Sequence, residues 1–447
     1  MLDEMLQKIA GATAIAILAA SAAAVPAAEG HASKATISRP NLEPFPHNSG
    51  RLRPLSPPRT KSCSVTALGS GKDDAAQILK AFHDCNNGGT VVLDGSYTIA
   101  TALDLTFLES VDVALSGKIT FKADIDYWVK NSFKYAFQNS SAFWQIGGRD
   151  VNIYGGGVGI IDGNGQPWWD AFVSNQSLLR PISLLLDGLQ GGSVTGVHMI
   201  NPPNWFNLIA NSSDILVSDM VLTAKSSNSN SVKNSDGWDT YRSDHVVIQN
   251  SVIDNTDDCV SFKPNSTNIV VQGLRCTGSH GISVGSLGQY IDQYDIVENV
   301  HIYNNTMSNA SDAARIKVWP GVHSEFQPIL SGGGGSGYVK NVTYERYQST
   351  NNDWAIEVNQ CYGQSNKTLC ELYPSNMTIS DIYFVDMWGT TSSKNDPKVG
   401  TLVCSSPEQC YNFHAKNVSI TSPKGKSQWI CSNFDTSNLE GFDCVSG

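Results

Sequence analysis

A short pattern, one polar residue followed by alternating apolar positions, recurs along most of this chain. Each copy is similar to Asn268-Ile-Val-Val271, and such alternation is typical of a short β-strand with one buried face. Successive copies start 40, 64, 31, 23, 31, 42, 35 and 41 residues apart. Strands that return at this interval indicate a solenoid or a propeller. The copies begin at Ser110, Asp150, Asp214, His245, Asn268, Asn299, Asn341, Asn376 and Asn417.

The uneven spacing separates these two architectures. A propeller blade needs four strands and a steady period, whereas a parallel β-helix lets insertions leave each coil as loops. The shortest interval, 23 residues, then corresponds to one coil, and coils stack at the ~4.8 Å distance between strands. Only 16% of the residues are charged, too few for a helical bundle. We therefore predict an all-β fold, a right-handed parallel β-helix.

One helix and three segments complete the predicted organisation. Asp73 or Asp74 can cap a helix that runs to Cys85, and Gly88-Gly89 ends it. Because the exposed end of a stacked sheet must be covered, we expect this helix to cap the N-terminal coil. The predicted segments are a signal peptide at 1–28, a proline-rich arm at 29–60 and a single β-helix catalytic domain at 61–447.

The N-terminus indicates secretion. An apolar run from Ile9 to Val25 precedes small residues, which is typical of a signal peptide, although Asp3 and Glu4 replace the usual positive charges. The run is short for a membrane span, and no later segment approaches ~20 apolar residues. We expect a secreted, extracellular monomer that binds no membrane. The net charge of −11 (30 − 41) also argues against a nucleic-acid partner.

Ten cysteines and ten Asn-x-Ser/Thr sites agree with an oxidising compartment. Spacing does not fix the connectivity of disulfides, and pairing between neighbours along the chain is the simplest guess. That guess gives Cys63–Cys85, Cys259–Cys276, Cys361–Cys370, Cys404–Cys410 and Cys431–Cys444. The candidate glycosylation sites are Asn139, Asn175, Asn211, Asn265, Asn304, Asn309, Asn341, Asn366, Asn376 and Asn417.

Counting from the repeats places several polar residues on neighbouring coils. Asp257 lies 11 residues after Val246, and His280 lies 11 residues after Ile269, so the two occupy equivalent positions. Asp236 lies 21 residues before Asp257, about one coil below it. On the next coil up, a pair of cations at positions i and i+2 of a strand points to one face. The spacing predicts one column of Asp236, Asp257, His280 and the pair Arg315 and Lys317, with Asp258 adjacent.

Three carboxylates flanked by cations are costly to place together unless they have a function. Like charges raise the pKa of one carboxyl group, while neighbouring Arg and Lys hold another ionised. Glycoside hydrolysis requires this divergence, because one carboxylic acid protonates the leaving oxygen while one carboxylate activates water.

Four ordered segments resemble the signature blocks of the polygalacturonases, glycoside hydrolase family 28. They are Asn234-Ser-Asp-Gly-Trp-Asp239, Asn255-Thr-Asp-Asp-Cys259, Ser279-His-Gly-Ile-Ser-Val-Gly-Ser286 and Arg315-Ile-Lys317. The resemblance implies a pectin-lyase-like right-handed β-helix. It also implies hydrolysis, with inversion and without a cofactor or metal, of the α-1,4-galacturonosyl bonds of pectin or polygalacturonate.

The resemblance also implies a role for each matched residue. Two departures from the family pattern, Ser235 for Thr and Ser279 for Gly, remove no reacting group. They resemble the exo-acting members, which implies release of galacturonate from the non-reducing end, with Ser226–Ser235 and Gly332–Gly335 as candidate loops closing the groove. The implied roles are Asp257 as general acid, Asp236 and Asp258 on the water, His280 as the group tuning the acid, and Arg315 with Lys317 on the substrate carboxylate.

Other interpretations stay open at this point. A polysaccharide lyase can use a β-helix but needs calcium-ligating acids and a proton abstractor. A rhamnogalacturonan or xylogalacturonan hydrolase, or an endo-polygalacturonase, would share the fold, and a non-catalytic carbohydrate-binding protein would not need stacked acids. Asp239 and Asn255 are expected to be structural hydrogen-bonding residues, and Trp168-Trp169 core residues.

Overall fold

The computed structural model describes residues 37–41, 55–327 and 330–446. The chain divides into two compact units, Met1–Ala35 and Thr36–Gly447, and all described residues belong to the second. The predicted signal peptide and most of the predicted arm therefore lie outside the described residues. Within the described ranges, no helix is both long and apolar enough to cross a bilayer.

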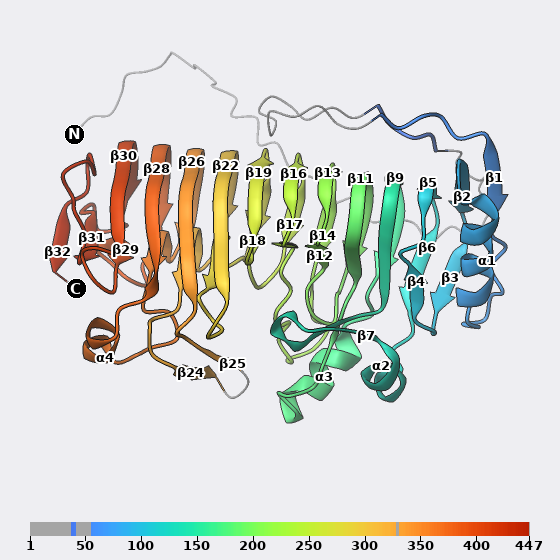
Figure 1. Cartoon of the computed structure of the whole chain (residues 1–447), viewed down its shortest axis with the longest axis horizontal. Coiled ribbons are helices and arrows are strands. Elements are labelled where there is room, and N and C mark those ends of the chain that lie inside the picture. Colours follow the sequence, from blue (N-terminus) through green and yellow to red (C-terminus); the bar gives the residue numbers. More distant parts are fainter. Residues whose placement is uncertain (1–36, 42–54, 328–329, 447) are drawn as a thin grey trace, which may run out of the picture. The chain divides into compact units, whose positions relative to one another are not determined.

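Strands of successive coils pair in parallel and form three ladders along one continuous sheet (Figure 1). This arrangement confirms the predicted parallel β-helix. Ladder 1 contains β4 (Leu103–Leu105), β12 (Asn207–Ala210), β15 (Trp238–Tyr241), β18 (Val260–Phe262), β21 (Ile282–Leu287), β23 (Asp312–Val318), β27 (Trp354–Asn359), β29 (Lys398–Val403), β31 (Gln428–Ser432) and β32 (Cys444–Ser446).

Ladder 2 and ladder 3 form the other two sides of each coil. Ladder 2 contains β1 (Lys61–Ser64), β2 (Gly89–Leu93), β5 (Glu109–Leu115), β13 (Ser213–Ser218), β16 (Asp244–Gln249) and β19 (Ser266–Gln272). Ladder 3 contains β3 (Ser96–Ile99), β6 (Lys118–Phe121), β14 (Val221–Thr223), β17 (Val252–Asp254) and β20 (Arg275–Thr277). Long strands run through more than one ladder: β9 (Trp144–Asp162), β11 (Leu184–Ile200), β22 (Tyr294–Ser308), β26 (Ser336–Asn352), β28 (Asn376–Thr391) and β30 (Cys410–Thr421).

The polar residue that opens most of the repeats forms a corner of the coil. These residues have φ between 51° and 59°, a left-handed conformation that Asn and Asp tolerate better than most residues. Stacked corners also bond to one another: Asn299 Nδ2 donates to Asn268 Oδ1 at 3.1 Å, and Asn341 Nδ2 donates to Asn299 Oδ1 at 2.8 Å. The corners with positive φ are Ser110, Asp150, Asp214, His245, Asn268, Asn299, Asn341 and Asn417.

The register of the last two predicted copies is wrong. The strand pairing continues the corner of Asn341 through Asp381 and Asn412, because Val342 pairs with Ile382 and Ile382 with Phe413. Asn376 instead lies opposite Ser336 at the start of β28. Asn417 belongs to another corner, where its Nδ2 donates to Asp386 Oδ1 at 2.7 Å.

The predicted capping helix is confirmed as α1 (Ala75–Cys85), which packs its apolar residues against the first strands at the end of the stack (Figure 1). The carboxylate of Asp74 accepts hydrogen bonds from the backbone N–H groups of Leu68 and Thr98, both at 2.8 Å, and so ties the helix to β3. Among the described residues, three α-helices and one short 3₁₀ helix that the sequence did not predict lie in insertions: α2 (Ile125–Asn131), α3 (Gln166–Ser174), α4 (Lys367–Leu372) and η1 (Phe137–Asn139). Trp168 and Trp169 are buried in α3, as core residues.

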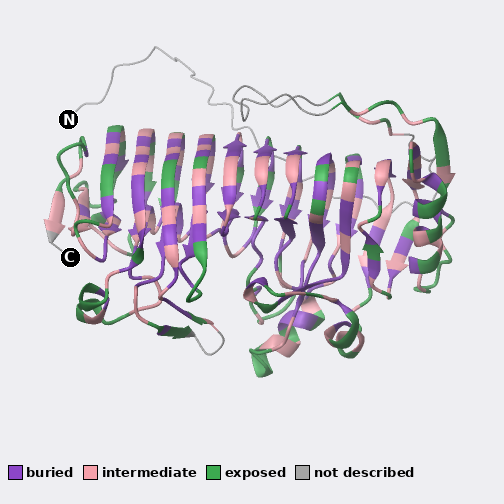
Figure 2. Ribbon diagram, in the orientation of Figure 1, coloured by how far each residue is buried: buried purple, intermediate pink, exposed green. Residues whose placement is uncertain are grey.

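Buried residues recur along the strands of the coils (Figure 2). Those of the interior are mainly apolar, with Ile, Val and Leu stacked coil upon coil. The five disulfides are those guessed from neighbouring cysteines. The described end of the arm is docked by Arg59, whose buried guanidinium pairs with Asp112 at 3.0 Å and Asp150 at 2.9 Å. All ten candidate glycosylation asparagines except the partly buried Asn265 are exposed.

Candidate active site

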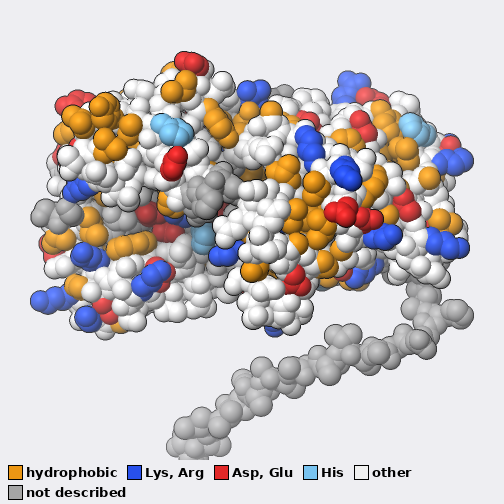
Figure 3. Space-filling view, turned by 90° about the horizontal axis from the view of Figure 1, so that it is seen from below, with side chains coloured by type: hydrophobic (Ala, Val, Ile, Leu, Met, Phe, Trp, Pro, Cys, Tyr) orange, Lys and Arg blue, Asp and Glu red, His pale blue; other side chains and the backbone are white. Residues whose placement is uncertain are grey.

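A cavity of about 940 Å³ lies over ladder 1 and contains all the predicted site residues. Its walls come from segments that leave the coils on one side (Figure 1). They include residues between β7 (Phe133–Tyr135) and β8 (Ser140–Ala142), residues before β10 (Pro181–Ile182), and the hairpin of β24 (Ser324–Gln327) and β25 (Leu330–Gly332). Figure 3 views the molecule from this side, where acidic and histidine side chains are visible in a hollow. The predicted residues in its lining are Asp236, Asp257, Asp258, His280, Arg315 and Lys317.

The turn before β18 positions two of the carboxylates. The side-chain amide of Asn255 donates to the backbone carbonyls of Ser235, Asp257 and Asp258 at 2.8 to 3.0 Å, so it acts as the predicted structural hydrogen-bonding residue. The hydroxyl of Ser279 also donates to the carbonyl of Asp257 at 2.7 Å. The hydroxyl of Ser235 accepts from Thr256 N at 2.9 Å. Both serines that depart from the family pattern therefore hold the turn.

Asp258 is held from two neighbouring coils. Its Oδ1 accepts a hydrogen bond from the Ser283 hydroxyl on β21 at 2.7 Å, and its Oδ2 accepts from Lys317 Nζ on β23 at 2.6 Å. Gly285 lets these strands approach, because a Cβ on it would lie 2.4 Å from the carbonyl oxygen of Lys317. The buried carboxylate is therefore fixed in position and neutralised.

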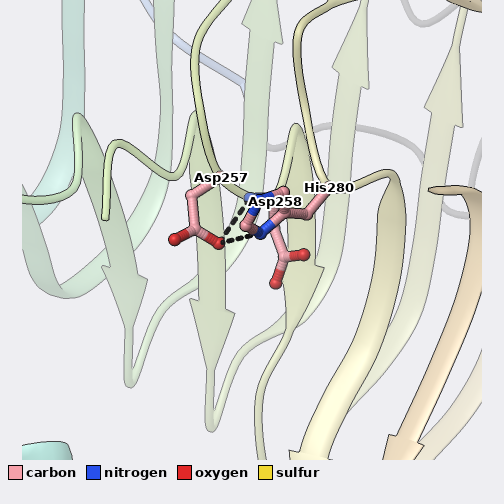
Figure 4. A group of neighbouring side chains, drawn as sticks. All are labelled: Asp257, Asp258 and His280. Atoms are coloured by element: carbon pink, nitrogen blue, oxygen red, sulfur yellow. Dashed lines mark hydrogen bonds and ion pairs between the residues drawn. The ribbon is translucent and has the colours of Figure 1, made fainter. Parts of the chain in front are cut away.

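Asp257 and His280 face each other at the floor of the cavity (Figure 4). His280 Nδ1 lies 3.1 Å from Asp257 Oδ1, which also accepts a hydrogen bond from Asp258 N at 2.9 Å. The side chain of Asp257 is 20% exposed, whereas those of Asp236 and Asp258 are 5% and 1% exposed. Of these three carboxyl groups, Asp257 is therefore the most accessible to a bound substrate.

Lys263, a cation that was not predicted from the sequence, lies beside two of the acidic residues. Lys263 follows β18, and its Nζ lies 3.6 Å from Asp236 Oδ2 and 3.7 Å from Asp239 Oδ2. The prediction that Asp239 is a hydrogen-bonding residue is wrong, because neither of its buried carboxylate oxygens has a hydrogen-bond partner among the described residues. Asp239 is instead a buried carboxyl group beside Lys263. The sequence signal for this position was that Asp239, on β15, lies only three residues after Asp236.

Arg315 and Lys317 both project from β23 into the cavity, but with different partners. Arg315 Nε lies 2.7 Å from Glu357 Oε2 on β27, and its Nη1 lies 3.5 Å from Asp312 Oδ2. Lys317 instead pairs with Asp258. The predicted single column is therefore wrong in detail. The register places Arg315 beside Ser283 and Lys317 beside Gly285, so both cations lie further along the strand than His280. Of the two, Lys317 reaches back to Asp258.

The three acids differ in their tendency to hold a proton. Burial, with the charges of Asp257 and Asp239, raises the pKa of Asp236 well above its ordinary value. Burial acts to raise the pKa of Asp257 too, but the hydrogen bond and charge of His280 outweigh it and lower that pKa. Burial also acts to raise the pKa of Asp258, but the charges of Lys317 and Lys263 together outweigh it and lower that pKa. The predicted divergence is present, but in the free protein Asp236 rather than Asp257 is the carboxyl group with the raised pKa.

Asp257, Asp258 and His280 each place a potential metal-ligand atom within 4.8 Å of the others, the one such group among the described residues. Lys317 Nζ, however, occupies Oδ2 of Asp258, and Ser283 occupies Oδ1. The ammonium group of Lys317 neutralises the carboxylate of Asp258 as a metal ion would. The geometry is that of hydrogen-bonded acids rather than of a metal centre.

Comparison with known proteins agrees with this site. The family model "Glycosyl hydrolases family 28" matches residues 89–440. "Probable exopolygalacturonase X" of Aspergillus fumigatus is 57% identical over 88% of this chain and 91% of its own length. "Exopolygalacturonase X-1" of Emericella nidulans is 54% identical over 94% of this chain and 95% of its own.

Among solved structures, an endo-xylogalacturonan hydrolase from Aspergillus tubingensis is similar, with a TM-score of 0.77 and 35% identity. The match covers 86% of this chain and 99% of that one. The sequence match, the β-helix and the clustered carboxylates therefore lead to the same conclusion. The chain belongs to family 28 of the glycosyl hydrolases.

Proposed function

We propose that this enzyme hydrolyses the α-1,4-galacturonosyl bonds of polygalacturonate and removes galacturonate from the non-reducing end. The observation that carries the proposal is the convergence of three carboxylates with opposite protonation tendencies in one cavity that also holds Arg315 and Lys317. Relatives named exopolygalacturonases at 57% and 54% identity support the substrate and the exo mode.

In the proposed reaction, Asp257 gives its proton to the glycosidic oxygen as the bond to the anomeric carbon breaks. Asp236 and Asp258 orient a water on the opposite side, and this pair accepts its proton as the new bond forms, which inverts the anomeric centre. A substrate carboxylate beside Lys317 and Arg315 offsets the charge of Lys317, which together with His280 lowers the pKa of Asp257. The pKa of Asp257 therefore rises when substrate binds. Asp257 then takes up the proton that it gives to the glycosidic oxygen.

The wall nearest Asp257 supports attack at a chain end. Arg180 Nη1 donates to the carbonyls of Pro203 and Lys233, both at 2.8 Å, and its Nη2 donates to Asn234 Oδ1 at 2.6 Å. Asn234 Nδ2 in turn lies 3.4 Å from Asp257 Oδ2. The buried guanidinium thus fixes the end of the predicted Ser226–Ser235 loop in the cavity wall next to the acid, while Gly332–Gly335 is absent from the cavity lining.

Replacing Arg180 with Met is expected to open this wall, because the three hydrogen bonds that hold it are lost. The enzyme should then release oligomers in addition to galacturonate from polygalacturonate, as measured by anion-exchange chromatography of the products. The control is Arg149→Met, which removes an exposed arginine paired with Glu109 away from the cavity. A monomer-only product from Arg180→Met would contradict the role of this wall.

Activity on polygalacturonate should be highest at mildly acidic pH. Burial acts to lower the pKa of His280, but the hydrogen bond and charge of Asp257 outweigh it and raise the pKa above the ordinary value of 6.5. The protonated form is therefore lost, and activity falls, as pH rises through this raised pKa. His280→Gln should abolish the alkaline limb, whereas His301→Gln, at a half-buried histidine beside Glu345 outside the cavity, should keep it. A wild-type rate unchanged between about pH 4 and pH 8 would contradict the assignment.

Xylogalacturonan hydrolysis is the second candidate, because the endo-xylogalacturonan hydrolase is 35% identical to this chain. The two functions separate on a substrate panel. Reducing ends should be released from polygalacturonate at least about tenfold faster than from xylogalacturonan or rhamnogalacturonan, without the ultraviolet absorbance of an unsaturated lyase product. The reverse preference would favour the second candidate.

We also infer that the enzyme is secreted. Five disulfides support an oxidising compartment, and the apolar run Ile9–Val25 supports export. N-terminal sequencing of the protein recovered from the culture medium tests this inference. A start near residue 29 is expected, and retention of the enzyme inside the cell would contradict it.

A further inference from the structure

Lys263 is a buried cation without a role in the proposed reaction. Its side chain is 5% exposed, and its Nζ lies 5.2 Å from the ring centroid of Trp205. The carboxylates of Asp236 and Asp239 lie at nearly equal distances from it, 3.6 and 3.7 Å. Burying an ammonium group is costly unless anions compensate it, so this cation belongs to the acids beside it.

Asp239 depends on the same cation. It is completely buried, and neither carboxylate oxygen has a hydrogen-bond partner within the described ranges. Lys263 is the one cation that forms an ion pair with it there. A single positive charge is therefore shared between two buried carboxylates, of which one, Asp236, belongs to the pair that acts on the water.

Other charged groups face this cluster from four neighbouring segments, and they balance it only in part. Asp257 and Asp258 add negative charge, while Lys317 and Arg180 add positive charge but hold other partners, Asp258 and backbone carbonyls. The groups concerned are Arg180 before β10, Asp257 and Asp258 before β18, His280 before β21, and Arg315 and Lys317 on β23.

We propose that Lys263 is a positioning residue that holds Asp236 in its anionic form, and that Asp239 competes with Asp236 for this charge. The inference rests on the proposed function, in which Asp236 acts on the water. Lys263 and Asp239 therefore shift the lower pH limit of activity in opposite directions. Neither residue is required to touch the substrate.

The electrostatic signs agree with this geometry. Burial is the largest influence on Asp239 and raises its pKa to about 7, while Lys263 opposes the rise. For Asp236, Asp239 raises the pKa and Lys263 lowers it. Removing Lys263 therefore raises the pKa of Asp236, and removing the charge of Asp239 lowers it.

The test compares Lys263→Met with Asp239→Asn, both nearly isosteric, on polygalacturonate. In Lys263→Met, the acidic limb of kcat/KM should move up by about one pH unit, with activity recovering at higher pH. In Asp239→Asn, the same limb should move to lower pH, and the double variant should lie between the two. The control is Lys118→Met, which removes a lysine paired with Asp162 outside the cavity and should leave the limb unchanged.

Two outcomes would overturn the proposal: a loss of kcat/KM that is equal at every pH, or limbs that move in the same direction in both variants. If Lys263→Met does not fold, Asp239→Asn alone tests the proposal. An acidic limb of kcat/KM that stays in place or moves to higher pH in Asp239→Asn contradicts it.

Melting temperature against pH is the second readout, because it needs no substrate. A carboxyl group whose pKa is raised in the folded state loses stability as pH rises through that pKa. Relative to wild type, Lys263→Met should therefore lose stability more steeply between about pH 4 and pH 8, and Asp239→Asn less steeply. If wild type does not hydrolyse polygalacturonate, the proposed function fails, and these slopes still confirm or contradict the shared charge.

Discussion

Replacement of Asp257 by Asn is expected to lower kcat on polygalacturonate by about 10³-fold, within the range that general acid catalysis contributes. An amide oxygen can still accept the hydrogen bond from Asp258 N and face His280 Nδ1, so the turn should persist. The amide has no proton to give to the leaving oxygen. The measurement is kcat from reducing-end release, beside the melting temperature of the variant.

The matched control for this change is Asp254→Asn. Asp254 is exposed on β17, three residues before Asp257 in the chain. The control should keep the rate of wild type, and both variants should melt close to it. More than about a tenth of wild-type kcat in Asp257→Asn would contradict its assignment as the acid, because loss of a general acid costs at least about 10²-fold.

Lys317→Met is expected to affect both stability and binding. Lys317 Nζ and Asp258 Oδ2 form a buried ion pair at 2.6 Å, and removal of one partner leaves the other charge unpaired. Such a loss costs about 3 kcal/mol of the free energy of unfolding, and the substrate carboxylate also loses a cation, so KM should rise. Chemical denaturation and steady-state kinetics at mildly acidic pH measure the two effects.

The control for Lys317→Met is Lys340→Met, at an exposed lysine on β26. It should change neither quantity by more than a small amount, because exposed lysines contribute little. If Lys317→Met kept both the free energy of unfolding and KM of wild type, neither the ion pair nor the carboxylate-binding role would stand.

The fold was predictable because its repeat is local. A strand that buries one face alternates apolar residues, and the corner before it favours Asn or Asp in the left-handed region, so both signals recur in every coil. The last two copies were placed wrongly because β28 and β30 run through more than one ladder and carry a similar pattern at each corner. The insertions with α2, α3 and α4 have no repeat to reveal them.

The site was predictable where a residue lies a fixed count from a repeat. Asp236, Asp257 and His280 are such residues, and the structure brings them together with Asp258, Arg315 and Lys317 in the cavity. Arg180 and Lys263 were missed for a physical reason. Arg180 lies in an insertion, and Lys263 at a strand end, where a lysine is usually exposed; only the surrounding acids in three dimensions explain its burial.

The sizes of the first products that wild type forms from long, unesterified polygalacturonate distinguish cleavage at the chain end from cleavage within the chain. If the clustered acids hydrolyse one terminal bond at a time beside the Arg180 wall, chromatography at under about 5% conversion should show galacturonate alone, while the remaining polymer shortens slowly. An early ladder of oligogalacturonates, or no galacturonate at all, would contradict cleavage at the chain end.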